Sequence, residues 1–126
     1  DPLWSRGLGD VYKRQILVKP IIYVCSPLKG DVKRNINKAI GYSRYVYVKG
    51  GIPLAPHTIF TQFLDDEDEE ERNAGIDMGL ELLNICDELW AFGDKISEGM
   101  LNEIERAKSL GIIVRRFNER CEPLDE

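Results

Sequence analysis

The chain has 126 residues, of which 43% are hydrophobic and 31% charged, a composition typical of one globular domain with its own core. The net charge of −5 argues against a broad surface for nucleic acid or anionic membrane. No apolar run is long enough to cross a bilayer, and no signal peptide is recognisable. The three cysteines form no CxxC pair, so we expect reduced thiols and a cytoplasmic location. A single histidine argues against a His-rich zinc site, and we expect no metal.

The first fifteen residues, DPLWSRGLGDVYKRQ, differ from the rest and show no clear period. They resemble the translated sequencing-adapter read-through found at the ends of metagenomic gene predictions, and the alternative is an ordinary disordered or strand-like terminus. We therefore assign residues 1–15 to a non-native or disordered segment, residues 16–117 to one domain, and residues 118–126 to a polar, weakly ordered tail.

In the first half of the domain, the sequence predicts a strand, a helix and a second strand. The apolar, β-rich run 21–25 is typical of a buried parallel strand. After the loop 26–31, apolar residues recur at helical spacing over 32–47, and Gly50 and Gly51 end this helix. Residues 52–55 form a brief second strand, interrupted by Pro53.

The acidic run 65–71 predicts the solvated first turn of a helix that continues to about residue 85, rather than a metal or partner site. This helix has two apolar sides, one with Ala74, Met78 and Ile85 and another with Ile76, Leu80 and Leu83. Since a helix with two apolar sides is either deeply buried or shared with a second subunit, we expect a homodimer or higher homo-oligomer.

The second half repeats the alternation of strand and helix. Residues 88–92 predict a third strand, residues 98–110 a helix capped by Ser97, and residues 112–114 a fourth strand. Strands that alternate with helices indicate a parallel sheet covered on both faces. We therefore predict a three-layer α/β domain with a parallel sheet of four to five strands.

Glu103 is the most informative residue of the sequence. Advancing the last helix by about 100° per residue places Met100, Ile104 and Ala107 on one face, and Glu103 falls inside that apolar arc. A carboxylate on an inward face is costly unless a partner compensates it. Glu103 is therefore either a functional carboxylate or a structural one, capped by a backbone amide or paired with Lys29 or Arg34.

Three loops are expected to meet at the carboxyl edge of the sheet, where ligands bind in open α/β folds: 26–31, 56–60 and 93–99. The helix amino terminus after Ser97 is a ready anion site. Alone, each polar residue of these loops is as well explained by capping or solvation. Together the loops present Ser26, Lys29, Arg34, His57, Asp94, Ser97 and the backbone amides of Glu98 and Gly99.

These segments resemble the nucleoside 2-deoxyribosyltransferase-like superfamily. The resemblance rests on 86–90 (CDELW), 97–104 (SEGMLNEI), 107–112 (AKSLGI) and the opening 22–27 (IYVCSP). The S-E-G-M-x-x-E-I and P-H elements are most similar to phage-associated domains of the DUF4406 kind. The resemblance covers about residues 21–115 and implies a Rossmann- or flavodoxin-like fold.

The resemblance also implies roles for individual positions. Glu103 matches the carboxylate that attacks the anomeric carbon, Tyr23 matches a tyrosine near the sugar, and Asp87 lies near an aspartate beside the base and sugar. A second acid must protonate the departing base, and Asp87 is the first candidate, ahead of Asp94. Ser97 stands where transferases usually carry Asp and resembles the serine with which nucleoside 5′-monophosphate N-glycosidases hold the phosphate. The tail has no match for the polar group that a neighbouring transferase subunit contributes.

The sequence thus predicts an enzyme that cleaves or transfers the N-glycosidic bond of a nucleoside or nucleoside 5′-monophosphate, without a cofactor. The alternative is a non-catalytic protein that binds or sequesters a nucleotide-derived ligand on the same fold. A flavodoxin-like redox module fits less well because the first loop is poor in Ser and Thr. A phosphoribohydrolase of the lysine-decarboxylase-like type is disfavoured because its PGGxGTxxE signature is absent.

Overall fold

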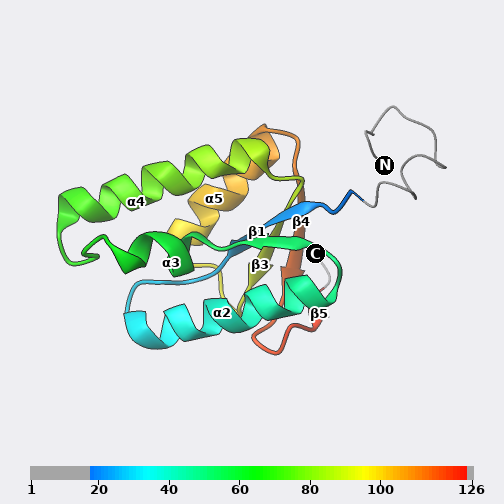
Figure 1. Cartoon of the computed structure of the whole chain (residues 1–126), viewed down its shortest axis with the longest axis horizontal. Helices are drawn as coiled ribbons and strands as arrows, with labels where there is room; N and C mark the ends of the chain where they lie inside the picture. Colours follow the sequence, from blue (N-terminus) through cyan, green and yellow to red (C-terminus); the bar gives the residue numbers. More distant parts are fainter. Residues whose placement is uncertain (1–17, 125–126) are drawn as a thin grey trace.

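A computed structural model describes residues 18–124, which form an α/β domain around one five-stranded sheet (Figure 1). The strand order is β2-β1-β3-β4-β5, in which the first four strands are parallel and β5 is antiparallel to β4. This confirms the predicted fold class. The expectation for residues 1–15 lies outside the described part of the chain. The strands are β1 (Ile21–Cys25), β2 (Ile52–Leu54), β3 (Glu88–Phe92), β4 (Ile113–Phe117) and β5 (Pro123–Leu124).

The helices begin where the sequence offers side-chain caps. Asp31 accepts a hydrogen bond from the backbone N–H of Arg34, Asp68 from those of Glu70 and Glu71, and Ser97 from that of Met100. The acidic run therefore precedes and opens its helix, which starts at Glu69 rather than 65. The helices are α2 (Val32–Val48), α3 (Pro56–Ile59), α4 (Glu69–Leu82) and α5 (Glu98–Ser109), with 3₁₀ turns η1 (Phe60–Gln62) and η2 (Leu83–Ile85). The loop expected at 56–60 is thus short helical turns.

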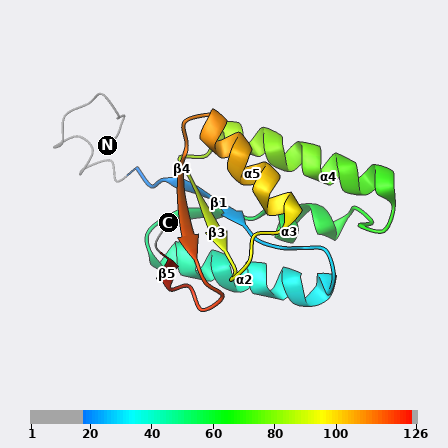
Figure 2. The same cartoon turned by 180° about the vertical axis from the view of Figure 1, so that it is seen from behind.

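The two faces of the sheet are covered by different helices, with α2 on one side and α4 and α5 on the other (Figures 1 and 2). Because side chains alternate along a strand, β1 contributes to both layers. One buried cluster joins Tyr23, Cys25, Leu83, Cys86, Leu89, Ala91, Met100, Ile104 and Ala107. The other joins Ile22, Val24, Tyr42, Val46, Ala55, Phe92 and Phe117. Tyr23 and Cys25 therefore face α5, on the side opposite to α2.

Within the described residues, the segment after β4 forms a turn and the short strand β5, while the weakly ordered tail expected for residues 118–126 stays a prediction. Phe117 and Arg116 of β4 pair with Pro123 and Leu124 of β5. The Asn118 carboxamide oxygen accepts hydrogen bonds from the backbone N–H groups of Arg120 and Glu122, both at 2.9 Å. A local turn of this kind satisfies the backbone and returns the chain to the sheet, although the segment is polar.

The strand order creates a switch point between β1 and β3. From β1 the chain first moves outward to β2, and then crosses back so that β3 pairs with the other edge of β1. At such a point the following loops separate and leave a crevice beyond the carboxyl ends of the strands. Among residues 18–124, no helix combines the length and apolarity needed to span a bilayer.

Candidate active site

A pocket of about 330 Å³ lies beyond the carboxyl ends of β1 and β2, against α3, α4 and the amino end of α5. Its volume lies at the lower end of the range for small-molecule sites. The loop after β1 contributes Ser26, Leu28 and Lys29, while α3 and its surroundings contribute Pro56, His57, Phe60 and Thr61. The opposite walls come from α4, with Arg72 and Asn73, and from α5, with Ser97, Gly99, Met100, Asn102 and Glu103.

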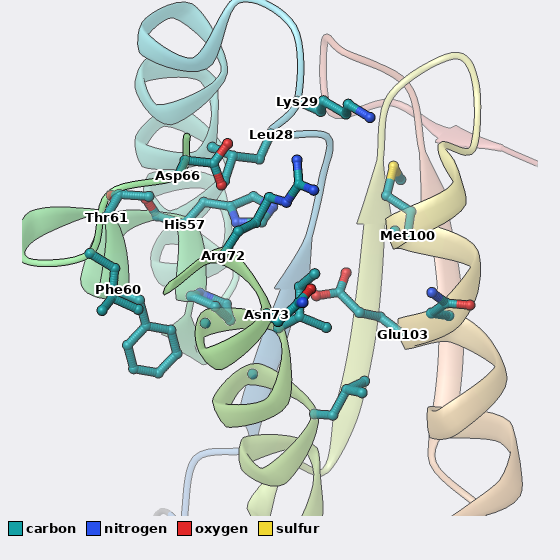
Figure 3. A pocket seen from close by; sticks show the side chains of 18 of the residues that line it. Leu28, Lys29, His57, Phe60, Thr61, Asp66, Arg72, Asn73, Met100 and Glu103 are labelled. Atoms are coloured by element: carbon teal, nitrogen blue, oxygen red, sulfur yellow. The ribbon is translucent and has the colours of Figure 1, made fainter. Parts of the chain in front are cut away.

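Glu103 reaches from α5 into this space, facing the side from which His57 and Arg72 enter (Figure 3). Both oxygens of its carboxylate accept hydrogen bonds from β1. The Tyr23 hydroxyl donates to Oε2 at 2.6 Å, and the Cys25 thiol donates to Oε1 at 3.2 Å. Neither Lys29 nor Arg34 forms the structural pair considered for this carboxylate; its partners are these two neutral donors.

The surroundings of Glu103 shift its ionisation toward neutrality. Burial raises the pKa of its carboxyl to about 7, while the hydrogen bonds from Tyr23 and Cys25 act in the opposite direction and stabilise the anion. The pKa values of the Tyr23 phenol and the Cys25 thiol are raised by burial and by the adjacent Glu103, so both keep the protons that they donate. The group is thus poised between its acid and base forms near pH 7.

Several donors that suit an anion line the pocket. Ser26 is 3% exposed, and its Oγ has no hydrogen-bond partner. The amino end of α5 adds the backbone N–H groups of Glu98 and Gly99, which have no acceptor within the helix. Lys29 and Arg72 also line the pocket and supply positive charge. A buried hydroxyl without a partner is costly unless a ligand or water engages it.

His57 supports the loop that carries this hydroxyl. Its Nε2 lies 2.8 Å from the backbone oxygen of Ser26, and because a carbonyl oxygen only accepts, Nε2 carries the proton. Burial lowers the pKa of the His57 imidazole, which favours the neutral ring. His57 therefore presents its unprotonated Nδ1 rather than a positive charge, and it holds the β1 loop in place.

The remaining wall of the pocket is apolar. It consists of side chains from the segment between β2 and the middle of α4, together with the β1 loop: Leu28, Pro56, Phe60, Leu64, Ile76 and Leu80. Gly79 lies in the same wall, and a Cβ there would be 3.0 Å from the Tyr23 hydroxyl oxygen. A planar, weakly polar group fits such a wall better than a charged one.

Three residues expected at the site do not line the pocket. Asp87 lies at the start of β3, where its Oδ2 accepts from the Ile21 N–H at 2.8 Å, at the sheet edge opposite the pocket. Arg34 is exposed on α2. Asp94 is exposed on a turn that the Gly93 N–H ties to the Phe117 backbone oxygen at 3.0 Å, which draws the turn toward β4.

The other predicted residues are brought together. The pocket is lined by six of them: Ser26, Lys29, His57, Ser97, Gly99 and Glu103. Tyr23 is buried in the core and contacts Glu103 through its hydroxyl. Sequence reasoning missed Cys25 as a partner of Glu103, and Arg72 and Asp66 as pocket residues. Cys25 could have been found from its two-residue spacing from Tyr23, because residues two apart on a strand face the same side. Arg72 and Asp66 were hidden within a charged stretch that is typical of a solvated helix start.

Metal-ligating side chains are not grouped here. Within residues 18–124, no three His, Cys, Asp or Glu side chains are placed to hold a metal ion. Cys25, Cys86 and Cys121 are all free thiols. One pocket thus combines a carboxyl group whose pKa is raised to about 7, several hydrogen-bond donors that suit an anion, and an apolar wall.

The chain is an α/β domain with a pocket at its switch point, and solved structures share its fold. Fifteen chains of known structure match. One is a 2-deoxyribosyltransferase from the psychrotolerant bacterium Bacillus psychrosaccharolyticus, which is 21% identical with a TM-score of 0.58 over 83% of this chain and 77% of that one. This likeness supports the nucleoside deoxyribosyltransferase-like fold.

The chain belongs to the family described as "Domain of unknown function (DUF7768)", whose profile matches residues 20–117. No curated protein matches the chain. The finer resemblance to phage-associated DUF4406 domains stays a prediction, because the family that matches is DUF7768.

Proposed function

We propose that this protein breaks the N-glycosidic bond of a nucleoside or nucleoside 5′-monophosphate, with Glu103 as the nucleophile. The observation that carries the proposal is the Glu103 carboxylate, which lines the pocket while Tyr23 and Cys25 fix its two oxygens. Cleavage of this bond passes through an oxocarbenium-like transition state, which a carboxylate on the opposite face of the sugar stabilises or traps covalently.

The polar and apolar parts of the pocket lining fit the two ends of a nucleotide. The unpartnered Ser26 hydroxyl and the amino end of α5 suit a 5′-phosphate, with Lys29 and Arg72 as charge partners. The apolar wall around Phe60 suits the face of a base. A monophosphate thus satisfies groups that an unphosphorylated nucleoside leaves unpaired.

The proton for the departing base needs a source other than Asp87, which lies at the opposite edge of the sheet. Asp66 and Glu71 are carboxyls from outside α5 that also line the pocket. Glu71 Oε1 already accepts from the Asp65 N–H at 2.7 Å. We therefore assign the general acid to Asp66, and Asp66→Asn is expected to slow the release of poor leaving bases most.

The test is product formation. Purified protein is incubated with a panel of nucleosides and 5′-monophosphates, and free base is measured by chromatography; added acceptor base distinguishes transfer from hydrolysis. Glu103→Gln and Glu103→Ala should abolish turnover, whereas Glu105→Gln, which removes an exposed carboxylate of the same helix, should not. Wild-type-like turnover by either Glu103 variant would remove Glu103 from the mechanism.

Two further variants test the phosphate assignment. Ser26→Ala and Arg72→Ala should raise KM for monophosphates about tenfold, the effect of one lost hydrogen bond to a charged group, with less effect on nucleosides. Tight binding of a monophosphate without any free base, unchanged in Glu103→Ala, would instead support a binding or sequestering protein.

A further inference from the structure

A buried thiol in contact with Glu103 has no part in the proposed mechanism. Cys25 is the last residue of β1 and is fully buried, at 0% exposure. Its Sγ lies 3.2 Å from Glu103 Oε1 and 3.8 Å from the backbone oxygen of Met100. Both neighbours are acceptors on α5, so the S–H group of Cys25 points toward this helix.

The strand geometry explains why this thiol and the Tyr23 phenol act together. Residues two apart on a strand project from the same face, so Tyr23 and Cys25 both point to α5, one at each oxygen of Glu103. The phenol at 2.6 Å is the stronger donor, and the thiol completes the pair at Oε1. A carboxylate with donors on both oxygens cannot rotate freely about its last bond.

We infer that Cys25 is a positioning residue for Glu103, whose thiol donates to Oε1, fixes the plane of the carboxylate and favours its ionised form. The inference rests on the proposed function in taking Glu103 to be the nucleophile, but the contact itself exists without substrate. Cys25 acts as a protonated donor, because burial and the adjacent Glu103 raise the pKa of its thiol well above the ordinary value.

Two substitutions separate donation from packing. Cys25→Ala and Cys25→Ser leave side chains of nearly equal volume, and only Ser keeps a donor. Cys86→Ala is the matched control, since Cys86 is also a buried thiol of the same core cluster but donates to the Leu82 backbone oxygen at 3.3 Å. The readout is the ionisation of Glu103, followed by carbon NMR of the labelled carboxyl in the substrate-free protein.

We expect Cys25→Ala to raise the pKa of Glu103 by about one unit, a tenfold change in the ionisation constant, from its wild-type value of about 7. Cys25→Ser should bring it back toward wild type, and Cys86→Ala should leave it there. An unchanged pKa in Cys25→Ala, or equal shifts in the Ala and Ser variants, would overturn the inference.

A second measurement needs no variant of Cys25. The S–H stretch in the infrared responds to hydrogen bonding, so the Cys25 band of the wild-type protein should move as Glu103 titrates, whereas the Cys86 band should not. Glu103→Gln should abolish that movement. A Cys25 band that is constant through the titration of Glu103 would refute the contact, even if Cys25→Ala fails to fold.

These readouts keep the inference distinct from the proposed function. If the enzyme is active, the acid limb of the pH profile of kcat/KM should move to higher pH in Cys25→Ala by the same amount as the NMR titration. If no nucleoside or nucleotide is cleaved, the proposed function fails while the NMR and infrared results still decide whether the thiol controls the carboxylate.

Discussion

Replacing Glu103 by Gln should change how the stability of the protein depends on pH. In the folded protein burial raises the pKa of Glu103 to about 7, against 4.5 for an ordinary glutamate. Between these two values the folded chain holds a proton that the unfolded chain has released. The free energy of unfolding therefore falls as pH rises through this window, because the native state binds more protons.

The size of the effect follows from the shift in pKa. Each unit corresponds to about 1.4 kcal/mol, so the shift from 4.5 to about 7 amounts to about 3 kcal/mol. The stability contributed by this group is complete below pH 4.5 and is lost as pH passes 7. Gln does not titrate, so Glu103→Gln should lack this loss, and its stability relative to wild type should rise by about this amount between pH 4.5 and 8.

Urea unfolding of wild type and Glu103→Gln at several pH values between 4.5 and 8 measures the difference directly. Glu105→Gln, an exposed change on the same helix, is the control and should follow the wild-type curve. A constant stability difference between wild type and Glu103→Gln over this range would show that burial does not raise the pKa of Glu103.

Four other substitutions have defined outcomes. Tyr23→Phe removes the 2.6 Å bond to Glu103 and should raise the carboxyl pKa by about one to two units, visible in the same NMR titration; an unchanged value would show that the phenol does not stabilise the anion. Gly75→Ala should stabilise α4 by about 0.5–1 kcal/mol in urea unfolding, because its Cβ would meet only the flexible Leu64 side chain at 3.4 Å. Gly79→Ala should lose that gain, because its Cβ would lie 3.0 Å from the Tyr23 hydroxyl, and equal gains would contradict this packing. Ser97→Ala should cost about 1 kcal/mol by removing the cap on the Met100 N–H, and no loss would refute that cap.

Local periodicity was enough to predict most elements of this fold. The strands 21–25 and 88–92 and the helix that starts after Ser97 have the predicted limits, because apolar runs, caps and glycines act on neighbouring residues. The same reasoning placed Glu103 on the inward face of its helix, since 3.6 residues per turn fix which side chains share a face.

The partners of Glu103 were decided by tertiary structure. Tyr23 and Cys25 are 80 and 78 residues away in sequence, and only the parallel pairing of β1 with β3 and the packing of α5 bring them to one carboxylate. The same global arrangement places Asp87 away from the pocket. It precedes a five-residue strand, so the carboxyl edge of the sheet lies about 16 Å away.

The walls of the pocket also depend partly on local sequence and partly on tertiary structure. Sequence alone determined that polar loops follow the strands, and that a capped helix start with free N–H groups lies among them. Which end of α4 faces those loops, and hence that Arg72 and Asp66 line the pocket, depends on strand order and helix packing. The physical reason is that periodicity and capping are set by residues a turn apart, whereas strand order and the docking of helices are set by burial over the whole chain.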